Sequence, residues 1–102
     1  MATYHQAMRS ADLLEGSPRA VQLLGVELVL VRLDGKAYAL ENNCTHDDFP
    51  LHEGGCENGE LVCPLHGARF DIRTGQVLSP PAFDDLRSFP VRELDGQVQV
   101  EL

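Results

Sequence analysis

The chain has 102 residues, 43% hydrophobic and 24% charged, with a formal net charge of −8. These values predict one globular domain over residues 1–102 and exclude a fibrous or disordered chain. Sixteen acidic residues against eight basic ones also exclude a nucleic-acid-binding protein, because no basic stripe is present to neutralise phosphates.

The sequence gives no sign of a targeting or membrane-spanning segment. The N-terminal region has no apolar run resembling a signal peptide, and no part of the chain approaches the roughly 18 consecutive apolar residues of a membrane span. We therefore expect no membrane association and a cytoplasmic location, where three cysteines, an odd number, favour metal binding over disulfides. Residues 10–16 predict a helical turn with Ser10 as its N-cap.

Short strands with turn residues between them dominate the rest. Residues 26–33 and 36–41 flank Asp34-Gly35, a strong hairpin signal, and residues 19–24 are expected to pair with this hairpin. A second hairpin is predicted from residues 87–94 and 97–102 around Asp95-Gly96. The predicted class is all-β, a small antiparallel barrel or sandwich.

The segment from about 42 to 80 differs from its surroundings. It is rich in Gly, Pro, Asn, Asp and His and is interpreted as a loop-rich insertion carried by the β scaffold. Two cysteine–histidine pairs lie within it, Cys44-x-His46 and Cys63-x-x-His66, with 16 residues between them. One structural zinc ion is the common use of such ligands, but zinc loops usually begin with a cysteine pair or end with a histidine pair. One Cys and one His in each loop suit a binuclear centre better, and a zinc-stabilised interaction domain remains the alternative.

These motifs closely resemble the Rieske family, in which two histidines replace two cysteines on one iron of a [2Fe–2S] cluster. The similarity runs through C-T-H, C-P-L-H-G and the flanking segments 30–43 and 68–91. It implies the Rieske fold, with 42–80 as the cluster-binding subdomain. It also implies that Cys44 and Cys63 bind one iron and that His46 and His66 bind the other at an exposed tip, where the electron leaves.

Four positions that differ from the respiratory members indicate which kind of Rieske protein the chain resembles. Respiratory Rieske proteins have a disulfide where this chain has Phe49 and Leu65, and hydroxyl groups near the cluster where it has Ala68 and Phe70. Fewer hydrogen bonds to the sulfurs predict a potential at the low end of the family range, roughly −150 to +300 mV. This pattern resembles the ferredoxins that pass single electrons from a flavin-dependent reductase to a terminal oxygenase of an aromatic-ring-hydroxylating dioxygenase.

On this resemblance the chain is an electron carrier, not an enzyme, that docks transiently through the His46/His66 tip. Only His5 and His52 remain for the two-His-one-carboxylate site of the oxygenase itself, and no second domain is expected that would arrange them. The small Rieske subunit of a nitrite reductase remains an alternative. The acidic surface, including Asp47 and Asp48, either steers the chain to a basic partner or only keeps it in solution.

Six further residues lie outside the predicted ligand set. Cys56 is interpreted as an unremarkable loop cysteine, and His5 and His52 as solvated histidines outside the site. The resemblance suggests that Pro80 and Pro81 form a loop that closes over the cluster, and that Gly67 permits close backbone approach to it.

Overall fold

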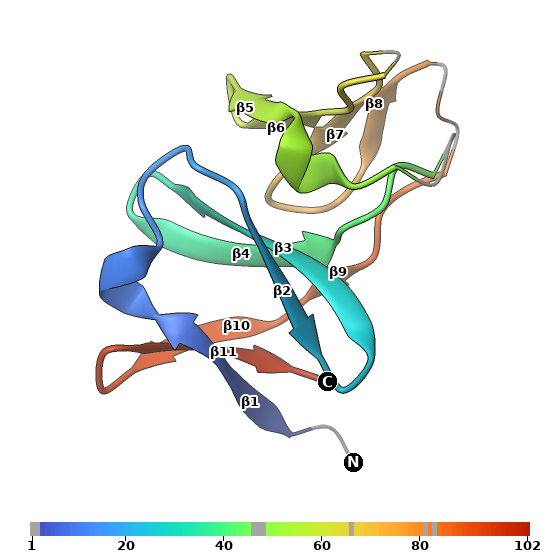
Figure 1. Ribbon diagram of the computed structural model, residues 1–102. Coiled ribbons are helices and arrows are strands. Elements are labelled where there is room, and N and C mark those ends of the chain that lie inside the picture. The colour runs from blue at the N-terminus through green and yellow to red at the C-terminus, as the bar shows by residue number, and fades with distance from the viewer. Residues whose placement is uncertain (1–2, 46–48, 66, 81, 83) are drawn as a thin grey trace.

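The computed structural model describes residues 3–45, 49–65, 67–80, 82 and 84–102. Within them the chain forms eleven strands in three sheets, with two single-turn 3-10 helices. All pairings between these strands are antiparallel, which confirms the predicted all-β class. In Figure 1 two sheets form a base and the third stands above it.

The first base sheet contains the most directly predicted strands. Its order is β2-β3-β4-β9, with bounds β2 Arg19–Leu23, β3 Val26–Leu33, β4 Lys36–Glu41 and β9 Ser88–Phe89. β3 and β4 form the hairpin predicted around Asp34-Gly35, whose two residues have φ of +52° and +81°. β2 pairs with β3, as expected for residues 19–24.

The second base sheet has the order β1-β11-β10, with bounds β1 Tyr4–Arg9, β10 Val91–Leu94 and β11 Gln97–Glu101. β1 was not predicted. The predicted strand 87–94 is two strands that belong to different sheets, because β9 pairs with β4 whereas β10 pairs with β11. Pro90 separates them, since proline has no N–H to continue a ladder.

β3 is buried on both faces, which explains its unbroken apolar sequence. Leu28 and Leu30 face the core between the two base sheets, where β11 contributes Val98 and Val100. Val29 and Val31 face the other way, into a core shared with the third sheet. Because strand residues alternate between faces, one strand anchors both cores.

The third sheet has the order β5-β6-β7-β8, with bounds β5 Gly55–Glu57, β6 Glu60–Val62, β7 Arg69–Asp71 and β8 Val77–Ser79. It lies within the segment interpreted as loops, so that interpretation is wrong for these four strands. Each has only three residues, too few for a hydrophobic period to emerge. One signal was available, since Asn58-Gly59 forms the β5–β6 turn with φ of +54° and +77°.

The two helices are single turns, η1 Ser10–Asp12 and η2 Leu51–Glu53. The predicted N-cap role of Ser10 is wrong. Ser10 is the first residue of η1, and the preceding Arg9 makes no capping hydrogen bond with its side chain. The carbonyls of Ser10 and Leu13 accept hydrogen bonds from the guanidinium of Arg32, which fastens this turn to β3. No helix in the described part of the chain is long and apolar enough to cross a bilayer.

The β2–β3 turn offers a stabilising substitution. Leu24 has φ of +50° and is 72% exposed, so it adopts a left-handed conformation without a buried contact in return. Asparagine tolerates this conformation far better, and we expect Leu24→Asn to raise the free energy of unfolding by about 1 kcal/mol. Thermal unfolding measures the gain. The opposite kind of change in the β10–β11 turn, Asp95→Leu at a φ of +52°, should lower stability by a similar amount. An unchanged melting temperature in both variants would contradict the explanation.

Candidate metal centre

Two loops carry the four predicted ligands. The first follows β4 and begins with Cys44, and the second follows β6 and begins with Cys63. His46 and His66 lie outside the described residues, so the site is built here from the cysteines and the backbone around them. Among the described residues no group of three or more His, Cys, Asp or Glu forms a metal site.

The backbones of the two loops are closed in the same way. The N–H of Cys44 donates to the carbonyl of Phe49, and the N–H of Cys63 donates to that of Ala68, each at 2.8 Å. Each cysteine is therefore bonded to the residue five positions later, and each predicted histidine lies inside the closed loop. The second loop is further tightened by Gly67, which donates to the carbonyl of Cys63 at 3.0 Å. Two equivalent loops are what a shared binuclear centre requires of its scaffold.

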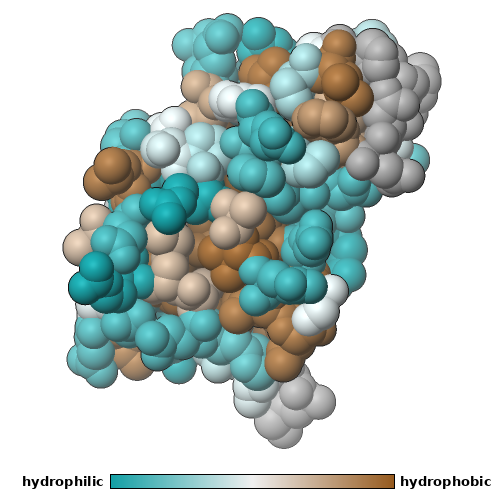
Figure 2. Space-filling view, viewed as in Figure 1, coloured by the Kyte–Doolittle hydropathy of each residue, from teal (hydrophilic) through white to brown (hydrophobic). Residues whose placement is uncertain are grey.

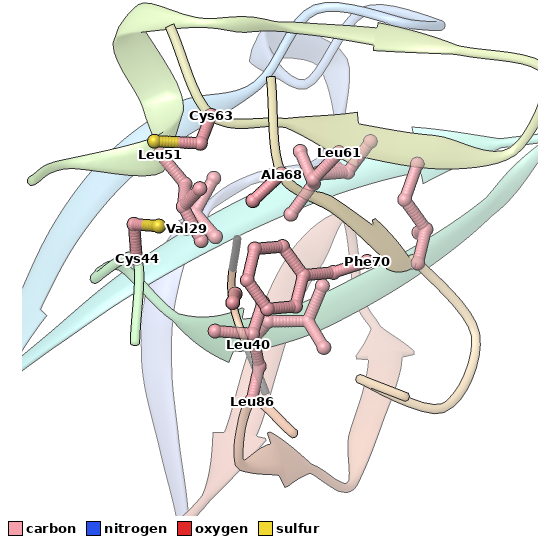
Figure 3. Close-up of a cluster of buried hydrophobic side chains, with 12 residues drawn as sticks. Val29, Leu40, Cys44, Leu51, Leu61, Cys63, Ala68, Phe70 and Leu86 are labelled. Atoms are coloured by element: carbon pink, nitrogen blue, oxygen red, sulfur yellow. The ribbon is translucent and has the colours of Figure 1, made fainter. Parts of the chain in front are cut away.

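Both cysteines are buried, with exposed fractions of 0% and 1%. They belong to one hydrophobic cluster with Val29, Leu51 and Phe70. Figure 3 shows the two cysteine side chains at the same end of this cluster, near Leu51 and Val29. Water is thus kept from both thiols by side chains of β3, of η2 and of the third sheet.

Close backbone approach brings the first loop against the second. η2 is followed by Gly54, where an added Cβ would overlap the carbonyl oxygen of Val62, the residue before Cys63. Glycine is needed here for that contact. Gly67 has a different reason to be glycine, because its φ of +74° is left-handed and no described atom lies within 4 Å of where a Cβ would be.

The positions that depart from the respiratory pattern have apolar surroundings. Ala68 and Phe70 are fully buried and have no hydroxyl to donate. Phe49 is partly buried and packs against the same cluster. Leu65 is 48% exposed and adds apolar surface beside the second loop.

The segment that leads from β8 back to the base is hydrogen-bonded to the first loop. The hydroxyl of Thr45 donates to the carbonyl of Asp84 at 2.8 Å, and Leu86 donates its N–H to the carbonyl of Gly75 at 2.8 Å. Ala82 and Leu86 are buried in the cluster that holds the cysteines. Pro80 is exposed, and Pro81 lies outside the described residues. Sequence analysis missed Thr45 because its bond partner is 39 residues away.

Cys56 is separate from this centre. It lies in β5, where its thiol is 3.6 Å from the carbonyl oxygen of Gly16 and donates to it. Burial and the nearby carboxylate of Glu15 raise the pKa of the Cys56 thiol. The thiol is therefore kept protonated, which fits the interpretation of Cys56 as an unremarkable cysteine, although it lies in a strand rather than in a loop.

The two remaining histidines differ from each other. His5 lies in β1 and its ring is 3.2 Å from the Thr3 hydroxyl, remote from the loops in sequence. The interpretation of His52 as a solvated residue is wrong, because it is half-buried and bonded twice to the buried side chain of Asn42. Asn42 was missed altogether, because nothing in the sequence distinguishes it from the neighbouring Asn43.

Charge is distributed unevenly along the chain. The segment 42–67 contains five acidic residues and no Lys or Arg. Two of the five, Glu57 and Glu60, pair with Arg69 at 3.1 and 3.3 Å, and these hydrogen bonds raise the pKa of Arg69. Figure 2 shows hydrophilic atoms over the β5–β6 end of the third sheet and hydrophobic atoms toward its other end. Asp47 and Asp48 lie outside the described residues.

The donor set fits a binuclear iron–sulfur group. Two buried cysteines in equivalent loops supply soft thiolate ligands, and the apolar wall around them is the kind of dry setting in which such clusters are held. The predicted histidines in the same loops would supply two neutral donors.

Comparisons with known proteins agree with this donor set. A family model described as "Rieske [2Fe-2S] domain" matches residues 3–90. The ferredoxin component of a naphthalene 1,2-dioxygenase system from Pseudomonas putida is 36% identical over 97 residues, which are 95% of this chain and 93% of that protein.

Two solved structures extend the similarity to the fold. A ferredoxin of Sphingomonas yanoikuyae B1 superposes with a TM-score of 0.92 at 29% identity, covering 98% of this chain and 99% of that one. A chain from a complex of reduced oxygenase and oxidised ferredoxin in carbazole 1,9a-dioxygenase has a TM-score of 0.89 at 32% identity, covering 95% and 91%.

Proposed function

Because the chain belongs to the Rieske [2Fe–2S] domain family, we propose that it is the ferredoxin of an aromatic-ring-hydroxylating dioxygenase system. It carries single electrons from a flavin-dependent reductase to a terminal oxygenase. The observation that carries this proposal is similarity to dedicated ferredoxin components over more than nine-tenths of both chains. The chain is an electron-transfer component rather than an enzyme, as the names of its relatives imply.

The proposed ligands are Cys44 and Cys63 on one iron and His46 and His66 on the other. The cluster-binding subdomain is about 42–80, which includes both loops and the third sheet. When bound, the cluster supplies reversible one-electron chemistry, made easier than in all-cysteine clusters by two neutral imidazoles. The protein's own part is to hold two thiolates in a dry pocket and to keep both loops closed in the oxidised and reduced states.

Partner recognition is proposed to occur at the end of the molecule that carries the loops. The absence of Lys and Arg from 42–67 gives the sequence there a negative charge that a basic partner surface complements. The exposed Leu65 would add a small apolar contact suited to a transient complex. We also propose a cytoplasmic location, where thiols stay reduced and available as ligands.

A redox titration followed by EPR tests the proposal. We expect one reversible one-electron wave at the low end of roughly −150 to +300 mV, with an average g below 2 in the reduced protein. A colourless protein containing one zinc ion would overturn the proposal in favour of a zinc-stabilised domain. Stable, stoichiometric association with a larger flavin- or haem-bearing chain would instead favour the small subunit of a nitrite reductase.

A further inference from the structure

Asn42 is the one buried polar side chain in the described part of the chain, with an exposed fraction of 5%. It lies just after β4 and two residues before Cys44. Its backbone N–H donates to the carbonyl of Glu27 in β3 at 3.0 Å, which fixes it to the base. Its side chain reaches across the first ligand loop to His52.

Two hydrogen bonds join the side chain of Asn42 to His52, and together they define the orientation of both groups. The backbone N–H of His52 donates to Asn42 Oδ1 at 3.0 Å, which identifies that atom as the oxygen. The other amide atom, 2.9 Å from His52 Nδ1, is then the NH₂ group and donates. His52 Nδ1 is therefore the acceptor, and the ring proton is on Nε2.

These bonds close the segment 43–51 into a ring that contains Cys44. Inside it lies the shorter ring made by the bond from Cys44 to the carbonyl of Phe49. The outer ring is fixed to the base through Asn42, whereas η2 begins at Leu51, which is buried in the cluster that holds both cysteines. Both ends of the first ligand loop are thus held by one side chain.

We infer that Asn42 and His52 are positioning residues for the metal centre, which fix the loop of Cys44 without being ligands. The inference rests on the proposed function. Outer groups that orient ligands typically contribute about 10- to 100-fold to metal affinity. The second loop needs no such pair, because Cys63 follows β6 directly and Gly67 tightens the turn after it.

Substitutions at His52 distinguish the hydrogen bond of its ring from that of its backbone N–H. His52→Leu keeps the backbone bond to Asn42 but removes the ring acceptor, leaving the amide NH₂ of Asn42 without that partner. His52→Gln restores an acceptor through its side-chain oxygen. The ring lies beside an open pocket of about 310 Å³ lined by residues of β2 and by Pro50, so either side chain has room and both variants should fold.

The test uses cluster-loaded protein and a chelator that takes up released iron. We expect His52→Leu to release iron about tenfold faster than wild type, with a displaced reduction potential and altered g values of the reduced cluster. His52→Gln should remain close to wild type in all three measurements. His5→Leu, a histidine variant in β1, is the matched control and should change none of them.

Hydrogen exchange distinguishes a local from a global effect. In His52→Leu the amides of 42–52 should exchange faster, while those of β3 and β11 keep their wild-type rates. If His52→Leu matches His5→Leu in iron release, potential and g values, the positioning role is wrong. A wild-type protein that holds no iron–sulfur cluster would overturn the proposed function, and this inference with it.

Discussion

Replacement of Cys44 or Cys63 by alanine is expected to yield a protein without a cluster. Each cysteine is one of two protein ligands proposed for one iron, so alanine should lower cluster retention by at least about a hundredfold, the upper end of what loss of an outer partner costs. Both side chains are buried, so water does not reach the position of the missing thiolate and cannot replace it as a ligand. Visible absorption, iron and sulfide content and the EPR signal of the reduced protein measure the loss.

The third cysteine provides a matched control. Cys56 lies in β5 and donates its thiol to Gly16, and alanine there removes one weak hydrogen bond. We expect Cys56→Ala to keep wild-type iron content and potential. Loss of the cluster in Cys56→Ala, or its retention in Cys44→Ala, would show that the ligand set is assigned wrongly.

The sequence predicted the base better than the part that carries the site. β3 and β4 were evident because an apolar run adjoins Asp34-Gly35, and β11 because Val98 and Val100 alternate with polar residues. The β2–β3 turn was not evident, since Leu24-Gly25 is an unusual pair for two positive φ angles. The strands β5–β8 escaped detection because tertiary packing, rather than local pattern, stabilises such short segments.

The candidate site shows the same division between local and distant information. The two cysteines were predictable from their spacing to the histidines, and the structure places both in one buried cluster. The bonds that hold their loops were not predictable. Asn42 is bonded to a residue ten positions away, and Thr45 to one 39 positions away. Neither spacing belongs to a helix or strand period, so only folding of the base brings these groups together.

Replacement of Arg32 by methionine is expected to cost about 3 kcal/mol of stability, the largest effect of any substitution in the base that we predict. Its guanidinium donates to the carbonyls of Leu13 at 2.7 Å, Ser10 at 3.1 Å and Gly35 at 3.0 Å. It also donates to both carboxylate oxygens of Glu93, at 2.9 and 3.1 Å. Methionine would fill much of the space but remove all five of these hydrogen bonds, although the Ser10 carbonyl keeps the N–H of Leu13 as a donor.

The expected loss of stability is large because the side chain of Arg32 is mostly buried. The side chain of Arg32 is only 15% exposed, whereas that of Arg73, which pairs with Asp34 at 3.0 Å, is 50% exposed. Arg73→Met is therefore the matched control, with an expected cost of at most about 0.5 kcal/mol. In thermal unfolding of a domain of this size, the Arg32 variant should melt roughly 12–24 °C lower and the control about 2–4 °C lower. Equal shifts would contradict the explanation.

Acid should remove the part of this stability that depends on Glu93. The hydrogen bond from Arg32 holds the pKa of Glu93 below its ordinary value of 4.5. A carboxyl whose pKa is lower in the folded state stabilises the fold above its unfolded pKa, and this contribution is lost as the pH falls through the folded pKa. Because the Glu93 side chain is 33% exposed, solvent screens the pair, and we expect Glu93→Gln to cost only about 1 kcal/mol at neutral pH.

The pH series thus separates the two roles of Arg32. Below the folded pKa of Glu93, wild type and Glu93→Gln should become equally stable, since both then carry a neutral side chain at this position. Arg32→Met should remain less stable than either, because the carbonyls of Ser10, Leu13 and Gly35 still lack the hydrogen bonds that Arg32 donates. If all three proteins converge in acid, the ion pair alone would account for the effect of Arg32. The bonds to η1 and to the β3–β4 turn would then contribute nothing measurable.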